Sequence, residues 1–403
     1  MSAIRLYEDN AYIRDFEAQI TGIASGDLGT EVTLDRTAFY PESGGQPCDH
    51  GFIADQAVLQ VLERDGEIIH ILASNCPLTE GPVKCRLDWE RRYDLMQQHC
   101  GQHILSAALD KLFGAATVGF HLTEEHTQID LAIEELTEAM IKEAEALANL
   151  AVHSPARICV HFPDAAALAE MPLRKPPTVA DGIRIVEVED FDWSPCCGTH
   201  PGCAAEVGLI KIIRVEKVKK QSRVEFLCGQ RAMRDYDAKN RLLLELSAML
   251  SIGTDEIPAQ ISRLQDTNKQ AKKELQEVRE KLLRHEADQL LAESADPETD
   301  LHIVSRVFPD RPTDELRLLA GFICAYPSAA AILAGTAGDS AHIILARSKD
   351  LDIHMGEICK QVAPFVAGRG GGSPQIAQCG GNDLSGLPQA LATATELIVK
   401  AKL

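Results

Sequence analysis

Alternating apolar and polar residues dominate the N-terminal part of the chain. The segments Glu31–Asp35, Ala57–Val61 and Glu67–Ile71 follow a period of two, which is typical of strands that bury one face. Turn signals such as Asp65-Gly66 and Glu80-Gly81-Pro82 separate these segments. The pattern therefore predicts a small β-barrel or a strongly curved sheet over residues 1–90.

The periodicity becomes helical from Asp88 onward. Apolar positions recur near every 3.6 residues as far as Gly114, which is a plausible helix stop, and this helix carries His99 and His103. A second helix is predicted over 137–150, and strand-like runs return over 182–227. Pro195 and Gly198 make the segment between them a turn. Residues 91–231 are thus predicted to form a mixed α+β domain.

A heptad pattern marks the next segment, residues 232–293, as a helical coiled-coil linker. Its apolar seam contains one polar Asn and runs through Ile257, Ile261, Leu264, Asn268, Ala271, Leu275, Val278, Leu282 and His285. A seam of this length needs a partner helix. That partner is either the preceding Leu242–Leu250 helix, folded back at Gly253, or the same helix of a second subunit.

The last segment, residues 294–403, is α/β in character. Strands are predicted over 301–307 and 341–346, and helices around 316–319 and 387–397. Gly368–Pro374 is a glycine-dense loop whose N–H groups are suited to hold a phosphate or a ribose, although tight turns explain it equally well. It matches neither the dinucleotide-binding pattern nor the P-loop pattern.

Composition and charge exclude several classes of protein. The chain of 403 residues is 45% apolar, but no apolar run approaches the roughly 20 residues of a membrane span, so no membrane association is expected. The 12 cysteines are scattered behind a polar N-terminus, which favours a reducing cytoplasm over a disulfide scaffold. A net charge of −20 argues against indiscriminate binding to nucleic acid.

A local basic strip is the exception to the acidic charge. It comprises Arg214, Lys217, Lys219, Lys220 and Arg223. Lysines commonly protect the exposed edge of a β-ribbon, and a strip that contacts phosphates is an equally good interpretation.

Two short clusters provide the ligand types of a zinc site. His99-Cys100-Gly101-Gln102-His103 and Cys196-Cys197-Gly198-Thr199-His200 each place a histidine four residues after another candidate ligand. Either pair alone could arise by chance among 13 His and 12 Cys. Together they predict one Zn²⁺ per chain, held by imidazole nitrogens and a thiolate.

The segment Asp35–Gly51, which contains the run Phe39-Tyr40-Pro41-Glu42-Ser43-Gly44-Gly45-Gln46, resembles the start of the editing module of alanyl-tRNA synthetases. The two ligand clusters then fall where that family has its HxxxH and CxxxH motifs. The glycine-dense segment resembles one in the family's C-terminal domain, which DHH-type phosphoesterases share. The chain has no room for a class II aminoacylation core, so it is most similar to stand-alone, long-form alanyl-tRNA editing proteins.

This resemblance implies a fold and an activity. The expected fold is α+β: an N-terminal barrel, a zinc-containing editing domain, a helical coiled-coil hairpin and a C-terminal α/β domain. The expected activity is hydrolysis of the ester that joins a wrong amino acid, chiefly serine and in second place glycine, to alanine tRNA. The partner is therefore mischarged alanine tRNA, and a homodimer through the coiled coil or the C-terminal domain is a further possibility.

The resemblance also assigns residues. The metal ligands would be His99, His103, Cys196 and His200, with the adjacent Cys197 as a rival thiolate. Four protein ligands are typical of a structural zinc site, so metal binding does not by itself imply metal catalysis. Substrate contacts are expected from Thr37, Phe39, Tyr40, Gly44, Gly45, Gln46, Asp49 and Gln102. Contacts with tRNA are expected from Lys217, Lys219, Lys220, Arg223, Arg369, Gly370 and Gly371.

Recognition of serine requires a polar group for the one hydroxyl that alanine lacks. Thr37 is the first candidate for this role and Gln102 the second, because Gln102 lies between the two helical ligands. Two other functions compete with editing. One is a non-catalytic tRNA-binding module with structural zinc. The other is a phosphoesterase, for which the expected Asp-His-His cluster is missing upstream in the sequence.

Overall fold

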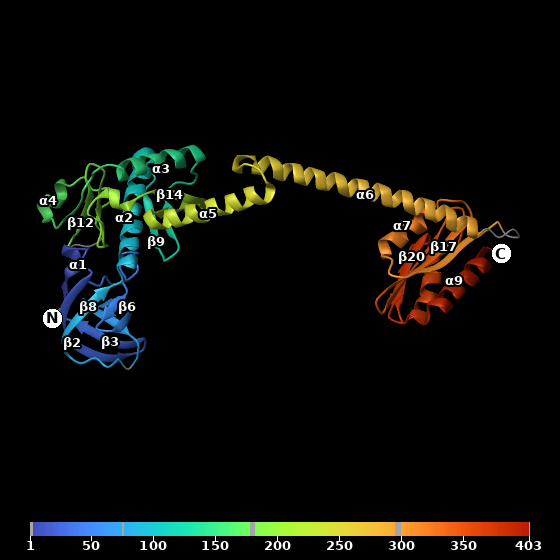
Figure 1. Cartoon of the computed structure of the whole chain (residues 1–403), viewed down its shortest axis with the longest axis horizontal. Helices are drawn as coiled ribbons and strands as arrows, with labels where there is room; N and C mark the ends of the chain where they lie inside the picture. The colour runs from blue at the N-terminus through green and yellow to red at the C-terminus, as the bar shows by residue number, and fades with distance from the viewer. Residues whose placement is uncertain (1–2, 75, 178–181, 295–299, 403) are drawn as a thin grey trace. The chain divides into compact units, whose positions relative to one another are not determined.

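The computed structural model describes residues 3–74, 76–177, 182–294 and 300–402 (Figure 1). The chain divides into two compact units, Met1–Met249 and Leu250–Leu403. The predicted boundaries at 90, 231 and 293 are finer than this division and stay a prediction. Among the described residues, no helix combines the length and the apolar character that a bilayer crossing requires.

The N-terminal part of the first unit is a closed six-stranded barrel with the strand order β2-β3-β7-β6-β5-β8. The strands are β2 (Asp15–Gly26), β3 (Gly29–Leu34), β5 (Gly51–Ile53), β6 (Gln56–Arg64), β7 (Glu67–Leu72) and β8 (Gly81–Leu87). A short helix, α1 (Leu6–Asp9), follows β1 (Ile4–Arg5), which pairs in parallel with β4 (Arg36–Thr37). Alternation places side chains such as Val32 and Leu34 inside the barrel.

Helix α2 (Trp89–Phe113) is the centre of the second core. The Asp88 side chain caps its first turn, and Gly114 ends it in the left-handed conformation with φ of 61°, as the sequence predicts. Gly101 is required inside the helix because a Cβ there would lie 2.2 Å from Cys228 Sγ. The absence of a side chain lets α2 pack directly against the neighbouring sheet.

That sheet has the strand order β14-β15-β10-β9, and a three-stranded sheet, β11-β12-β13, completes the domain. The elements are β9 (Thr117–Leu122), β10 (Thr127–Leu131), α3 (Glu138–Val152), β11 (Ile158–His161), α4 (Ala165–Glu170), β12 (Ile185–Val188), β13 (Asp192–Pro195), η1 (Ala204–Val207), β14 (Ile210–Val218) and β15 (Gln221–Cys228). Thr137 caps α3, as predicted. The segment after β13 is a loop, which agrees with the turn expected there.

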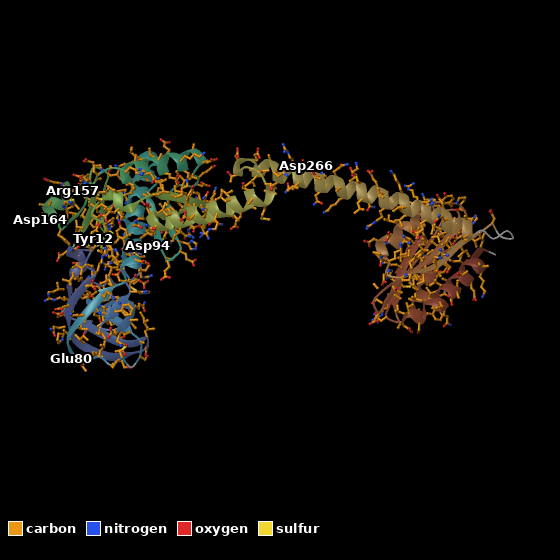
Figure 2. All side chains as sticks on the ribbon, viewed as in Figure 1. Tyr12, Glu80, Asp94, Arg157, Asp164 and Asp266 are labelled. Atoms are coloured by element: carbon orange, nitrogen blue, oxygen red, sulfur yellow. The ribbon has the colours of Figure 1, made fainter. Side chains whose placement is uncertain are left out.

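Polar contacts join the barrel segment to this second core. Figure 2 labels Tyr12 in the first unit. Its hydroxyl lies 2.7 Å from Glu206 Oε1 and accepts a hydrogen bond from Gly202 N–H at 2.6 Å. On the other side of the core, Arg231 pairs with Asp94 of α2 and fixes the start of the next helix. The first unit is therefore held together by more than chain continuity.

Two long helices follow, separated by a turn at Gly253 as the sequence predicts. They are α5 (Gly229–Leu250) and α6 (Ile257–Glu293), with the short helix η2 (Thr254–Glu256) between them. The heptad positions Ile261, Leu264 and Leu275 are exposed, whereas Leu283 and Leu290 near the end of α6 are buried in the second unit. The last turns of the predicted linker thus belong to the C-terminal core. The partner of the exposed seam stays a prediction.

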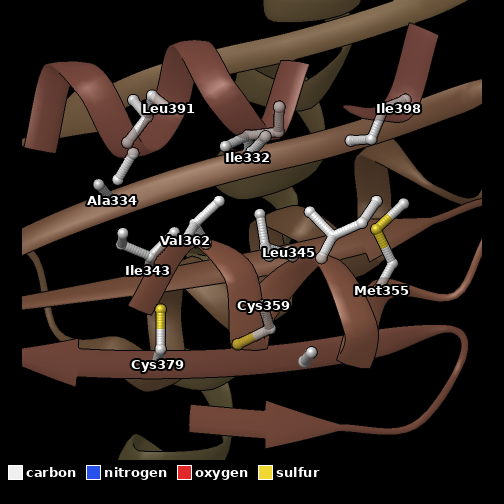
Figure 3. Close-up of a cluster of buried hydrophobic side chains, with 14 of the residues drawn as sticks. Ile332, Ala334, Ile343, Leu345, Met355, Cys359, Val362, Cys379, Leu391 and Ile398 are labelled. Atoms are coloured by element: carbon white, nitrogen blue, oxygen red, sulfur yellow. The ribbon is translucent and has the colours of Figure 1, made fainter. Parts of the chain in front are cut away.

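The second unit is a five-stranded sheet with helices on both faces. Its strand order is β16-β17-β18-β20-β19, with only β16 and β17 parallel. The elements are β16 (His302–Phe308), α7 (Thr313–Ile323), β17 (Ala329–Ala337), β18 (Ser340–Arg347), α8 (Met355–Val362), η3 (Ala363–Val366), β19 (Arg369–Gly372), β20 (Ile376–Gly381) and α9 (Leu387–Lys402). Figure 3 shows the core on one face, where α8 and α9 cover Ile332 and Ile343.

The glycine-dense segment is a strand, and the expectation of a loop there was wrong. Residues Arg369–Gly372 form β19, in which Gly370 pairs with Cys379 of β20. A Cβ on Gly370 would lie 2.2 Å from the Cβ of Cys379, and one on Gly372 would lie 2.4 Å from the Cα of Ala377. Close packing of the sheet therefore accounts for these glycines without a bound phosphate.

Candidate metal centre

Four side chains from the two sequence clusters converge on one point. His99 and His103 come from α2, and Cys196 and His200 come from the loop after β13; one ligand atom from each lies within 4.8 Å of the others. Cys196 Sγ lies 3.1 Å from His99 Nε2 and 3.3 Å from His200 Nε2. The two helical imidazoles stack with their ring planes 8° apart, as an i, i+4 pair on one helical face allows.

The donor set fits a zinc ion. Burial alone would raise the pKa of the Cys196 thiol, but the three surrounding imidazoles hold it well below its usual value. A thiolate with three imidazole nitrogens is a typical tetrahedral zinc ligand set. Cys197 is exposed and lies outside the cluster, so the structure favours Cys196 between the two adjacent thiols.

A second layer of residues orients the ligands. Gln46 Oε1 accepts a hydrogen bond from His99 Nδ1 at 2.8 Å and another from Thr199 N–H at 3.1 Å. Because Nδ1 of His99 carries the proton, its Nε2 presents a lone pair to the cluster. Gln46 thus holds a ligand and the ligand loop, and its predicted contact with substrate stays a prediction.

His103 has a comparable neighbour in Asp192. Its Nδ1 lies 3.6 Å from Asp192 Oδ2, and Arg174 Nε donates to Asp192 Oδ1 at 2.8 Å. Burial would raise the pKa of Asp192, but its contacts with His103 and Arg174 lower that pKa to about 2. A carboxylate that is ionised at neutral pH therefore faces the outer nitrogen of this ligand.

Replacing Gln46 by alanine is expected to weaken zinc binding about 10- to 100-fold, the usual cost of removing a partner that orients a ligand. The measurement is competition of the purified protein with a chelator of known zinc affinity. Unchanged zinc affinity in Gln46→Ala would show that packing alone fixes the orientation of His99.

The cluster forms part of the wall of a cavity of about 350 Å³. His99, His103 and Cys196 line it together with Gln102 and Thr117. Gln102 Nε2 donates to Ser106 Oγ at 2.8 Å, and the Thr117 hydroxyl donates to the same oxygen at 2.7 Å. The metal cluster therefore shares its cavity with a network of polar groups that a small polar substrate could contact. Sequence patterns gave no signal for Ser106 or Thr117.

Comparison with known proteins identifies the family. Residues 183–224 match the second additional domain of threonyl and alanyl tRNA synthetases, and residues 302–400 match the DHHA1 domain. The alanyl-tRNA editing protein AlaX-L of Pyrococcus horikoshii is 32% identical over 389 residues, which cover 93% of this chain and 93% of the relative. The chain belongs to the alanyl-tRNA editing protein family.

Other proteins are similar to this chain over part of their own length or of this chain. The alanyl-tRNA editing protein Aarsd1 of Danio rerio is 31% identical over 66% of this chain and 68% of its own length. An alanine–tRNA ligase of Methanosarcina barkeri is 30% identical over 98% of this chain, which spans 44% of that enzyme. One solved structure that aligns with this chain is the C-Ala domain of Aquifex aeolicus alanyl-tRNA synthetase. The alignment covers 25% of this chain and 92% of the C-Ala chain, with 25% sequence identity and a TM-score of 0.24.

Within this editing-family chain, Thr37 lies in β4, is fully buried and is not among the residues that line the cavity. His70 Nδ1 donates to the Val32 carbonyl at 3.0 Å, so its Nε2 accepts a hydrogen bond from the Thr37 hydroxyl at 2.9 Å. Burial lowers the pKa of His70 to about 4, which keeps it neutral. Contact of Thr37 with a substrate hydroxyl stays a prediction, and it would compete with His70.

Asp49 is also engaged elsewhere. It is fully buried and forms an ion pair with Arg92, whose Nε donates to Asp49 Oδ1 at 2.9 Å. Asp49 Oδ2 accepts from Tyr40 N–H at 2.6 Å, and Arg92 Nη2 donates to the Ala38 carbonyl at 2.6 Å. These contacts fix the segment that carries the motif, so Asp49 supports the site from outside the cavity.

Of the remaining residues of the motif, some are buried and support the segment, and others line the cavity. Phe39 and Tyr40 are buried, and the Tyr40 hydroxyl donates to the Ser43 carbonyl at 3.2 Å. Gly44 lines the cavity with a φ of 58°, in the left-handed region that favours glycine. A Cβ on Gly45 would lie 2.9 Å from a ring carbon of Phe120. Ser43 and Gly44 are therefore the members of this segment that line the cavity, and their contact with substrate stays a prediction.

The basic strip is partly neutralised by acidic neighbours. Lys217 Nζ lies 2.7 Å from Glu134 Oε1, and Arg223 donates two hydrogen bonds to Asp130. Lys219 and Lys220 are exposed at the turn between β14 and β15. In the second unit, Arg369 is exposed on β19, and its neighbours Gly370 and Gly371 pair with β20. Contacts between these residues and tRNA stay a prediction.

Proposed function

We propose that this editing protein hydrolyses the ester that links serine to the 3′ end of alanine tRNA, with glycine as a second candidate substrate. The observation that supports this proposal is that three of the four ligands, His99, His103 and Cys196, line one cavity together with Gln102 and Thr117. Both of these polar side chains donate to Ser106 Oγ behind the cavity wall. An aminoacyl ester is already activated, so its hydrolysis needs mainly orientation, a water molecule and stabilisation of the developing oxyanion. The proposed compartment is the cytoplasm, which agrees with all 12 cysteines being free.

His99, His103, Cys196 and His200 would hold one Zn²⁺, which supplies a Lewis acid when bound. The surrounding residues supply orientation. Gln46 and Asp192 keep the ligand imidazoles in place, and Gly44 allows the ribose end of the substrate to approach the backbone. Phe120, whose ring centroid lies 5.3 Å from that of His99, adds an apolar surface to the cavity beside the cluster.

Discrimination between serine and alanine would rest on the polar network. Gln102 Nε2 is committed to Ser106, so its carbonyl oxygen is left to accept a hydrogen bond from the serine hydroxyl. Alanine offers no hydroxyl to this oxygen, so the site should disfavour alanine by the hydrogen bond that it cannot make. The geometry thus favours Gln102 over Thr37 as the residue that reads the hydroxyl.

The deciding experiment is incubation of the purified, zinc-loaded chain with alanine tRNA charged with serine or with alanine. We expect rapid release of serine and little release of alanine, measured by acid precipitation of labelled aminoacyl-tRNA. Bound zinc and bound tRNA without release of serine would overturn the proposal in favour of a non-catalytic tRNA-binding module.

Gln102→Leu extends the same experiment to specificity. The loss of one hydrogen bond of about 1.4 kcal/mol predicts roughly 10-fold slower release of serine, with zinc content unchanged.

A phosphoesterase activity has less support, because among the described residues the four-ligand cluster is the one group suited to a metal. The glycine-dense segment that suggested such an activity is a paired strand.

A further inference from the structure

The cavity beside the metal cluster is positively charged in a strongly acidic protein. The chain carries a net charge of −20, yet no aspartate or glutamate is among the described residues that line this cavity. Two cationic side chains line it, Arg184 and Lys175. In the part of the chain that the structure describes, neither has a carboxylate within ion-pair distance, although Arg174, next to Lys175 in the sequence, is paired with Asp192.

Arg184 differs from the other buried arginines of the chain. Four other buried or half-buried guanidiniums are matched by a carboxylate, in the pairs Arg92–Asp49, Arg174–Asp192, Arg231–Asp94 and Arg311–Glu286. Half-buried Arg347 instead donates to several backbone carbonyls through both Nε and Nη1. Arg184 is 7% exposed, and its Nε is buried without a hydrogen-bond partner among the described residues. A buried charge is costly unless an anion or hydrogen bonds compensate it, so this guanidinium points to an external partner.

The remaining contacts of Arg184 hold it in position. Its Nη1 donates to the carbonyls of Cys196 at 2.8 Å and Gly198 at 2.9 Å, and its own carbonyl accepts from Cys196 N–H at 3.0 Å. Both of these residues belong to the ligand loop. The guanidinium therefore has a fixed orientation before any substrate binds, which lowers the entropic cost of contacting an anion.

The chemistry of the substrate identifies the anion. The esterified amino acid brings a positive amino group, and the ester and the ribose are neutral. The nearest negative charge is the phosphodiester that precedes the terminal adenosine, and arginine binds phosphate oxygens through paired N–H donors. We propose that Arg184 and Lys175 form a subsite for this phosphate, a proposal that rests on the editing function proposed above.

The experiment neutralises one phosphate in an otherwise intact substrate. Serine-charged alanine tRNA is prepared with a phosphodiester or a neutral methylphosphonate before the terminal adenosine, and kcat/KM is measured with the full, zinc-loaded chain. We expect the methylphosphonate to lower kcat/KM about 10-fold for the unaltered protein, the effect of one charge-assisted contact. Lys175→Ala should lower kcat/KM several-fold on the natural tRNA. On the methylphosphonate tRNA, the same substitution should change kcat/KM little.

Two further variants separate this subsite from a structural role. Arg184→Lys keeps the charge but loses the paired donors, and it should likewise show a reduced response to the methylphosphonate while keeping its zinc. Lys142→Ala removes an exposed lysine of α3 and should respond like the unaltered protein.

The outcomes are distinguishable. The phosphate subsite is overturned, while editing stands, if the unaltered chain has the same kcat/KM on the natural and the methylphosphonate tRNA. It is also overturned if Lys175→Ala and Arg184→Lys lower kcat/KM by the same factor on the two tRNAs. If the unaltered chain releases no serine from the natural tRNA, the proposed function itself fails, and the subsite with it.

Discussion

Replacing Cys196 by alanine is expected to remove zinc from the protein and to abolish release of serine from mischarged alanine tRNA. Loss of a partner that only orients a ligand already costs about 10- to 100-fold in metal affinity, so loss of the one thiolate should cost at least about 100-fold. It would also leave three imidazoles without the negative charge that they surround. The measurements are zinc content after dialysis and the rate of deacylation.

Cys197→Ala is the matched control, because it removes the neighbouring thiol that is exposed and outside the cluster. We expect it to retain one zinc per chain. The assignment of ligands would be reversed if Cys197→Ala lost the metal and Cys196→Ala kept it. Retention of full deacylation by zinc-free Cys196→Ala would show that the ion plays no part in the reaction.

Asp49→Ala is expected to destabilise the first unit by roughly 3–5 kcal/mol, because it leaves Arg92 buried without its carboxylate. Both side chains are fully buried, so water cannot compensate for the lost partner. Both tryptophans, Trp89 and Trp193, belong to this unit, and their fluorescence during urea denaturation of the full chain would report its unfolding.

Glu124→Ala provides the comparison for that ion pair. Glu124 pairs with Arg91, the residue next to Arg92, but its side chain is 70% exposed. Its loss should change stability by less than about 1 kcal/mol. If Asp49→Ala fails to fold, Asp49→Asn can replace it because asparagine keeps the shape of the side chain. This variant should also lower the free energy of unfolding, but by less than Asp49→Ala. Equal, small effects of Asp49→Asn and Glu124→Ala would contradict the importance of the buried pair.

Local signals explain which elements could be predicted. Helix α2 begins at the Asp88 cap and ends at Gly114, both of which are short-range features of the sequence. The four metal ligands could be named because two pairs with a spacing of four residues are visible without knowledge of the fold. The same holds for the cap at Thr137 and the turn at Gly253.

Features that depend on distant partners could not be predicted. Asp49 and Arg92 become a pair only after folding, so their ion pair could not be foreseen when Asp49 was predicted to contact substrate. Nothing in the sequence singled out Arg184, because only the fold shows that its Nε has no hydrogen-bond partner and that no carboxylate lines its cavity among the described residues. Gly370 and Gly372 were interpreted as loop residues, whereas their lack of side chains is required by the neighbouring strand β20.

The hydrogen bonds of Gln46 have a consequence for how the protein can be divided or recombined. Gln46 belongs to the chain segment between strands of the barrel, yet it holds a ligand from α2 and a residue of the ligand loop. A chimera joined at residue 90 would therefore pair a barrel from one parent with a metal site from another and break these contacts. Exchange between relatives should succeed only when the barrel and the metal-binding core are inherited as one block.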